Sequence, residues 1–234
     1  MGAYEIVRLI IVFVFMVIVL GKLIAKLFFK GNPMSTKFIA RTAVFTAVSI
    51  ILYTVPFLKF SLPIFPAFLE IHLDEIPALM AGFAYGPLSG FLVILVKTVV
   101  KLPLTGTAGV GELADFIYSA AFVLPAAFIY KKHRTLKGAL ISLLIATAVQ
   151  LVVASFGTTF IMLDVYSVLY HLPKQVILGM CQKINPSVTN LTWPFLLMVG
   201  LPFHALKDAI VVVVTFLLYK RLRWLFAKID AQKN

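Results

Sequence analysis

The sequence predicts an all-α membrane protein: a six-helix transmembrane bundle with one extra N-terminal hydrophobic helix. The first observation is composition, because the chain of 234 residues is 62% hydrophobic and only 13% charged, with a mean hydropathy of +1.03. Soluble globular domains do not need that much apolar surface. The second is that about six or seven apolar segments approach the length of about 20 residues that crosses a bilayer. The third is that basic residues gather at the ends of these segments.

The first apolar segment, residues 6–20, is followed by Lys22, Lys26 and Lys30. A secretory signal peptide carries its positive charge before the apolar core and small residues after it. This segment shows the reverse order. We therefore interpret residues 1–34 as an extra hydrophobic helix and linker that the mature protein retains.

Proline and glycine divide the rest of the chain into a membrane domain, residues 35–226, and a short cytoplasmic tail, residues 227–234. Gly86 with Pro87 ends one apolar segment and Pro103 ends the next, because proline cannot continue a helix. The expected helices cover residues 35–53, 73–85, 89–102, 112–130, 140–160 and 193–222, the last one interrupted near Pro202.

The basic residues also predict the topology. With six core helices, the basic segment before residue 42, the loop at 131–137 and the tail after residue 219 all fall on one side. By the positive-inside rule this side is cytoplasmic, and the loops at 57–73, 103–111 and 161–192 face outward. The net charge of +12 therefore reflects topology. We expect a multi-pass protein of the bacterial cytoplasmic membrane, embedded in the lipid bilayer and without a nucleic-acid partner.

Motifs for catalysis and cofactor binding are absent from the sequence. It contains no GxxxxGK[ST] phosphate-binding loop and no HExxH, CxxC or GxSxG motif. The single cysteine, Cys181, excludes an intramolecular disulfide and indicates neither metal nor redox chemistry. We therefore expect no enzyme activity, no metal and no cofactor.

Ionisable residues at membrane depth are the candidates for function. In the segment from residue 105 to 124, Glu112 and Asp115 are expected in the first turn of an apolar helix, where the macrodipole favours acids. Lys97 and Lys101 end the preceding helix. We expect Lys97 to pair with Glu112 and to brace the helix ends.

Two further segments combine polar and apolar groups. The outward loop at 57–75 mixes aromatic residues with acids and is either an interfacial loop or a lid over a pocket for a flat ligand. In the last helix, His204 shares one face with Lys207 and Asp208, which lie three and four residues further on. Asp208 either neutralises Lys207, or Lys207 serves a ligand carbonyl or anion; we favour the ligand.

Small residues mark one face of the first core helix, where Ala43 and Ala47 form an AxxxA pattern. Faces of this kind let membrane helices approach closely. The pattern predicts a helix-packing surface.

Four segments together, residues 68–90, 106–139, 184–191 and 201–222, resemble the S component of energy-coupling factor (ECF) vitamin transporters, within a match over roughly 36–225. The riboflavin-type branch is the most similar. The resemblance implies a bundle of the ECF S-component type that captures a vitamin outside the cell and has no ATPase of its own. It implies docking through Ala43 and Ala47 onto a coupling membrane subunit that carries two ATPase subunits. Riboflavin would be the transported substrate, not a cofactor.

The resemblance also implies site residues. Lys207 matches a lysine that contacts the flavin ring, whereas His204 and Asp115 stand where the branch has asparagine and Asp208 stands where it has glycine. These departures leave another vitamin open, such as pantothenate or a thiamine precursor. The full set of expected substrate contacts is Lys207, His204, Phe68, Leu69, Ile71, Asp115 and, by analogy of position, Asn185.

Two other classes of protein remain open from the residues alone. One is a secondary transporter driven by protons through the same carboxylates, but such folds are built from inverted repeats and none is apparent here. The other is an intramembrane enzyme with Glu112, Asp115 and His204 as its catalytic set.

Overall fold

The computed structural model of the protein describes residues 35–105, 109–169, 171 and 173–231. The predicted N-terminal helix at 1–34 lies outside the described residues. The described chain is helical, and its single β-type contact is one antiparallel bridge between Phe60 and Ile71. The all-α prediction is therefore confirmed.

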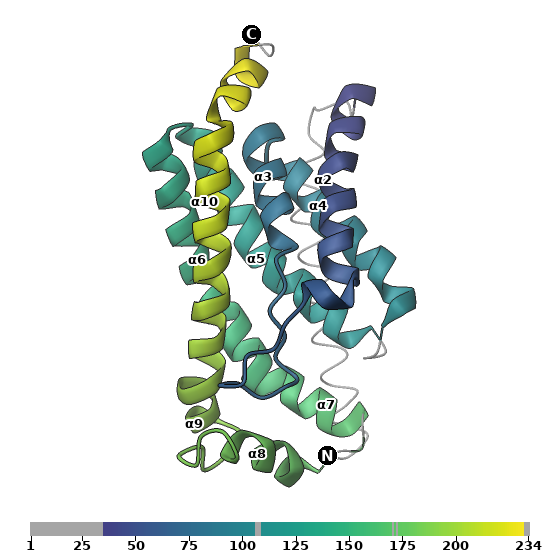
Figure 1. Ribbon diagram of the computed structural model, residues 1–234, viewed down its shortest axis with the longest axis vertical. Coiled ribbons are helices and arrows are strands. Elements are labelled where there is room, and N and C mark those ends of the chain that lie inside the picture. Colours follow the sequence, from purple (N-terminus) through teal and green to yellow (C-terminus); the bar gives the residue numbers. More distant parts are fainter. Residues whose placement is uncertain (1–34, 106–108, 170, 172, 232–234) are drawn as a thin grey trace.

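Six helices build the bundle, and they run along its long axis (Figure 1). They are α2 (Thr36–Thr54), α3 (Glu75–Tyr85), α4 (Pro87–Lys101), α5 (Val110–Lys132), α6 (Leu136–Gly157) and α10 (Leu201–Ala231). Five helical stretches of the described chain are long and apolar enough to cross a membrane. The sixth core helix, α3, has 11 residues and lies inside the others.

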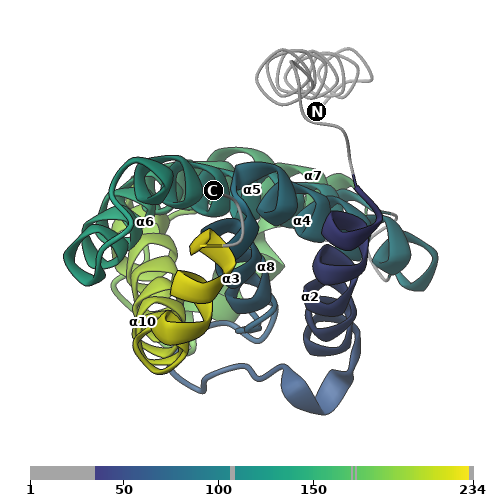
Figure 2. The same ribbon diagram turned by 90° about the horizontal axis from the view of Figure 1, so that it is seen from above.

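Helix α3 is the centre of the bundle. Every residue from Glu75 to Ala84 is buried, and Figure 2 shows α3 between α10 and α2, with α4 and α5 alongside. A helix that is apolar on all sides is stable only where neighbours cover it. Two acids at its N-terminal end, the capping residue Asp74 and the first helical residue Glu75, therefore lie in the interior.

Glycines allow α3, α4 and α5 to approach closely. A Cβ atom at Gly90 would lie 2.7 Å from Val123 Cγ1, and one at Gly82 would lie 2.9 Å from Ala127 Cβ. Larger side chains at these two positions would push the helices apart. Gly86, which joins α3 to α4, has a φ of 99°, a conformation that glycine adopts without strain.

One helix runs on where the sequence predicted a loop. The helix α6 continues through a π-helical turn, Thr158–Met162, into α7 (Leu163–Leu169), so the prediction of a loop from residue 161 was wrong. The last helix begins at residue 193 as predicted: α9 (Trp193–Phe195) continues through the π-helical turn Leu196–Gly200 into α10. The expected interruption near Pro202 is this turn, because Pro202 itself lies in the first turn of α10, where proline is tolerated.

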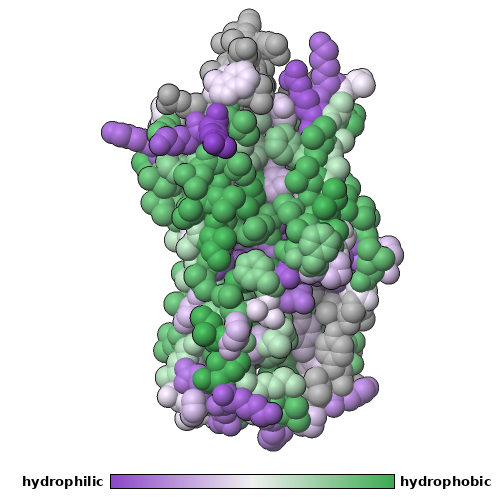
Figure 3. All heavy atoms as spheres, viewed as in Figure 1, coloured by the Kyte–Doolittle hydropathy of each residue, from purple (hydrophilic) through white to green (hydrophobic). Residues whose placement is uncertain are grey.

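The two ends of the bundle differ from its middle. Figure 3 shows hydrophobic side chains over most of the middle of one face and hydrophilic ones at both ends. Exposed apolar side chains on the outer helix faces, among them Val44, Val149 and Leu217, suit contact with lipid chains. At the lower end in Figure 1, the loop after α2, helix α7 and helix α8 (Lys174–Gln182) gather; these belong to the segments predicted to face outward.

The single cysteine lies in α8. Cys181 is buried and forms no disulfide, and burial raises the pKa of its thiol to about 11. A protonated, buried thiol is unreactive.

Candidate functional site

A cavity of about 630 Å³ lies within the bundle, near the end where the loop after α2, α7 and α8 gather. This volume is in the range of small-molecule sites, which are mostly apolar with a few convergent polar groups. Its apolar wall comes from several elements: Phe68, Leu69, Met162, Leu163, Ile177, Met180 and Phe203. Its polar wall includes Tyr53, His72, Asp115, Tyr118, His204 and Lys207.

The structure brings five of the seven predicted contact residues to this cavity. Phe68, Leu69, Asp115, His204 and Lys207 all line it. They come from the outward loop, α5 and α10, which are far apart in sequence.

The other two predicted residues lie elsewhere. Ile71 is fully buried in the apolar cluster beside the cavity, because its backbone pairs with Phe60 and this fixes its side chain toward the core. Asn185 lines a separate crevice with Pro63 and Cys181. Its carboxamide oxygen accepts a hydrogen bond from the Ser187 backbone N–H at 3.0 Å, so it does not reach the cavity in this structure.

A buried lysine organises the wall formed by α4 and α5. Lys97 is fully buried and its ammonium donates to Asp74, to Asp115 Oδ2 at 2.9 Å and to Ser119 Oγ at 3.2 Å. The ring of Tyr53 lies against the ammonium, 4.6 Å from Nζ to the ring centroid. Buried charges need partners of this kind.

The predicted pair of Lys97 with Glu112 is therefore wrong. Glu112 instead accepts from the Thr105 hydroxyl at 2.6 Å. Helix α5 begins at Val110, which puts Glu112 in its first turn and Asp115 one turn deeper. The depth explains the difference, because only Asp115 lies level with Lys97.

His72 connects this network to the cavity. Its Nδ1 is bonded to Asp74, and its Nε2 lies 3.5 Å from Asp115 Oδ1. The imidazole therefore bridges Asp74 and Asp115, and its ring packs on Tyr53 with 5.3 Å between centroids.

A second buried cation lies on α10. Lys207 Nζ is 3.4 Å from Glu75 Oε1, and the same oxygen accepts from Ser119 Oγ and Gln150 Nε2, both at 3.1 Å. Lys207 is thus paired across the bundle to α3, and its sequence neighbour Asp208 is not its hydrogen-bond partner. One turn before it, His204 Nε2 lies 3.1 Å from the Thr158 hydroxyl.

Sequence reasoning missed three members of the site. The sequence predicted an outer loop around His72 and placed Asp74 and Glu75 where this loop meets the helix from residue 73, but gave none of them a contact with the substrate. His72 lines the cavity, and Asp74 and Glu75 belong to the network beneath it. The available signal was a pair of adjacent acids directly before an apolar helix, since intramembrane acids require a partner.

The arrangement suits binding. A partly apolar chamber is bounded by a lysine, an imidazole and a carboxylate that can donate to and accept from a ligand. Among the described residues, no three His, Cys, Asp or Glu side chains are grouped to hold a metal ion.

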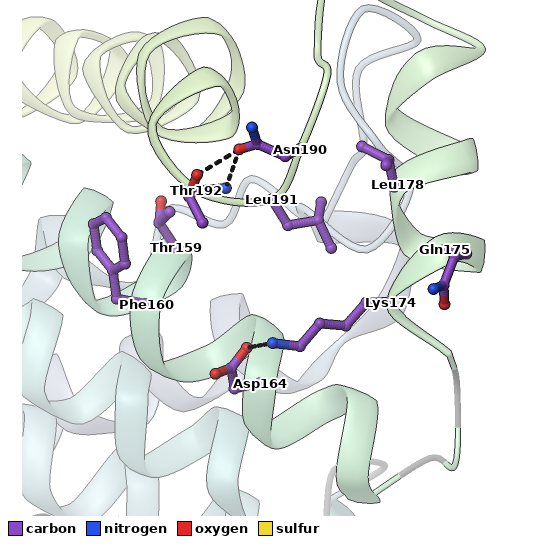
Figure 4. A pocket seen from close by; sticks show the side chains of 9 residues that line it. All are labelled: Thr159, Phe160, Asp164, Lys174, Gln175, Leu178, Asn190, Leu191 and Thr192. Atoms are coloured by element: carbon purple, nitrogen blue, oxygen red, sulfur yellow. Dashed lines mark hydrogen bonds and ion pairs between the residues drawn. The ribbon is translucent and has the colours of Figure 1, made fainter. Parts of the chain in front are cut away.

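A second, smaller cavity of about 300 Å³ lies between the π-helical turn after α6, α7, α8 and residues 190–192 (Figure 4). Lys174 and Asp164 form an ion pair of 2.5 Å across it. Asn190 turns back to accept from the Thr192 backbone N–H at 3.1 Å. None of the predicted site residues lines this cavity.

Comparison with known proteins agrees with this geometry. Residues 37–219 match the family model described as "ECF transporter, substrate-specific component". The chain is 30% identical over 182 residues to the riboflavin transporter RibU of Staphylococcus aureus (strain TCH60), covering 78% of this chain and 89% of the relative. It is also 30% identical over 189 residues to the riboflavin transporter FmnP of Bacillus subtilis (strain 168), covering 79% and 93%.

A solved structure gives the same result. The chain superposes with a TM-score of 0.61 and 29% identity on a structure described as "Structure and mechanism of the S component of a bacterial ECF transporter", covering 81% of this chain and 96% of the other. The family match spans most of the membrane domain. The chain therefore belongs to the family of substrate-specific S components of ECF transporters, and it is a multi-pass membrane transport protein rather than an enzyme.

Proposed function

We propose that this S component captures riboflavin from outside the cell in the cavity of about 630 Å³. The observation that carries the proposal is that Phe68, Leu69 and Lys207 line one cavity whose volume is in the range of small-molecule sites. The names of two relatives, both riboflavin transporters, support the same substrate.

The chemistry of the cavity fits a flavin. The isoalloxazine ring is flat and largely apolar, and Phe68, Leu69 and Phe203 offer it an apolar wall. Its carbonyl groups and ring nitrogens require donors, which Lys207 supplies, and the ribityl hydroxyls require acceptors such as Asp115. The His204 imidazole presents one donor or acceptor at each nitrogen and contributes to the polar edge.

Binding of riboflavin is tested by a titration of its fluorescence with the full chain purified in detergent. We expect stoichiometric quenching, because a ring enclosed among Tyr53, Tyr118 and Phe203 is stacked against aromatic groups. Pantothenate, thiamine and a thiamine precursor are added as competitors and should not displace the flavin. Absence of quenching would exclude riboflavin, and displacement by one competitor would identify that vitamin as the preferred substrate.

We propose, second, that α2 docks onto a coupling membrane subunit that works with two ATPase subunits to import the vitamin. Ala43 and Ala47 are exposed on one face of α2, and their small side chains would let a partner helix approach closely. The support is the exposure of a small-residue face in a protein of this family.

The docking proposal predicts a separation of binding from transport. Ala43→Trp and Ala47→Trp should leave riboflavin affinity unchanged and abolish uptake by cells, because the bulky rings face away from the cavity and block the dock. Val149→Trp, on the exposed face of α6, is the matched control and should transport normally. If uptake survived both alanine substitutions, the coupling surface would lie elsewhere.

A further inference from the structure

One buried acid in the bundle has no hydrogen-bond partner among the described residues. This acid is Asp208 on α10, which is fully buried and accepts at neither carboxylate oxygen from any part of the chain that the structure describes. The other acids beneath the cavity differ: Asp74 and Asp115 bond to Lys97, and Glu75 to Lys207. Asp208 is therefore the acid of this group that has no ion pair, whereas Asp74, Asp115 and Glu75 each pair with a lysine.

The described groups that face Asp208 offer it no cation of its own, because the one ammonium that acts on it, that of Lys207, is bonded to Glu75. On α3 the charged residue is Glu75. On α10 itself it is Lys207, which is already bonded to Glu75, and His204 lies one turn away. Helix α6, which packs along α10, carries Gln150 near Glu75 and has only Lys137 as a charged residue, in its first turn.

Other buried polar atoms on the same three helices also lack a hydrogen-bond partner among the described residues. They are the acceptors Glu75 Oε2 and Gln150 Oε1 and the hydroxyls of Thr147, Ser155 and Thr215. None of these hydroxyls donates to Asp208, so both of its oxygens lack a donor. Buried polar atoms are nearly always satisfied, by protein or by internal water, and an ionised Asp208 would need donors that the described side chains do not give it.

The physical chemistry selects a proton as the missing donor. An ionised carboxylate in this interior would be uncompensated and costly, and it would be repelled by Glu75. A metal cation would be repelled by the Lys207 ammonium that the same glutamate holds. A proton removes the charge of Asp208 and turns one of its oxygens into a donor.

We propose that Asp208 is a proton-binding site beneath the substrate cavity, a neutral carboxylic acid that donates through a buried water to Glu75 Oε2 or Gln150 Oε1. The site depends on this chain having an acid at the residue next to Lys207. Its existence does not depend on which vitamin the cavity binds.

The proton has a consequence for the cavity. If Asp208 loses it at alkaline pH, one more negative charge acts on Lys207, in addition to those of Glu75, Asp115 and Asp74. Lys207 would be held more firmly in the interior and donate less to a ligand. This consequence, which rests on the proposed function, is that riboflavin affinity falls as the pH rises.

Infrared spectroscopy of the ligand-free full chain tests the site directly. We expect the carbonyl-stretch band of a protonated carboxylic acid at neutral pH, a shift of this band on labelling aspartate with carbon-13 at the side-chain carboxyl, and its loss in Asp208→Asn. Asp164→Asn, which changes a partly exposed acid paired with Lys174, is the control and should keep the band. The isotope shift needs only the wild-type protein and assigns the band to one of the five aspartates of the chain. Asp74, Asp115 and Asp164 are ion-paired, so the shift still points to the buried, unpaired Asp208 if Asp208→Asn fails to fold.

Three results would overturn the proposal: absence of the band, a band that does not respond to aspartate labelling, or a band that survives in Asp208→Asn. Thermal unfolding in sodium chloride against choline chloride adds a fourth. If sodium stabilised the wild type but not Asp208→Asn, the ligand would be a metal cation and not a proton.

The link to the cavity is tested by measuring the affinity for riboflavin between about pH 6 and about pH 9. The wild type should bind about tenfold more weakly at the upper limit, which corresponds to about 1.4 kcal/mol, and Asp208→Asn should show a flat profile. If the infrared band is present but affinity does not change with pH, the link to the cavity is wrong. If riboflavin does not bind at any pH, the proposed substrate is wrong, while the infrared result still decides the proton site.

Discussion

Lys207→Ala should weaken riboflavin binding about tenfold or more while the bundle stays folded. A hydrogen bond from a charged donor contributes about 1.5–3 kcal/mol, and the Lys207 ammonium is the cationic donor that α10 brings to the cavity wall. The measurement is the fluorescence titration of the purified variant, with circular dichroism to show that the helices remain. Lys174→Ala, in the smaller cavity, is the matched control and should bind normally.

The pairing of Lys207 with Glu75 requires a second variant. Removal of the lysine leaves Glu75 with only Ser119 and Gln150 as donors, so part of any loss could come from an uncompensated charge. Glu75→Gln combined with Lys207→Ala removes that charge. The double variant should recover stability and remain weak in binding. Unchanged affinity in Lys207→Ala would remove Lys207 from the site.

Lys97→Met should lower the free energy of unfolding by about 3–5 kcal/mol, the cost of removing one partner from a buried ion pair. Lys97 is fully buried and lies between Asp74 and Asp115, so its loss leaves two carboxylates facing each other without a cation. Thermal unfolding in detergent, followed by circular dichroism, measures the effect.

Lys101→Met is the matched control for this prediction, because Lys101 lies one turn further along α4, is only partly buried and bonds to neither aspartate. It should unfold at nearly the wild-type temperature. Adding Asp115→Asn to Lys97→Met should restore part of the stability by removing one of the two charges. A wild-type unfolding temperature for Lys97→Met would show that the network does not hold the bundle together.

Hydropathy was sufficient to predict the helices that face lipid, because a bilayer requires long apolar segments whatever they pack against. It also indicated α3, which is short but apolar on all sides. It did not predict that α6 runs on to Leu169, because a π-helical turn at Thr158–Met162 keeps the helix intact through a segment of mixed polarity. Such a turn depends on tertiary packing, here with Tyr118 close to Gly157.

The site was predictable in its residue types and less so in its partners. Lys207, His204 and Asp115 stood out because ionisable groups are rare in membrane helices. Their partners are set by packing between helices: Lys97 bonds to Asp74 and Asp115, 23 and 18 residues away in sequence, and no local spacing predicts either contact. The pair expected from helix ends, Lys97 with Glu112, was wrong for this reason.

The single measurement that tests the central claim is the visible absorbance spectrum of the full chain purified in detergent, before and after riboflavin is added and the excess removed. The proposed function predicts that the protein carries or retains a flavin band in a ratio of one per chain, and that Lys207→Ala retains much less. A protein that stays colourless after saturation with riboflavin would contradict the assignment of the cavity to a flavin.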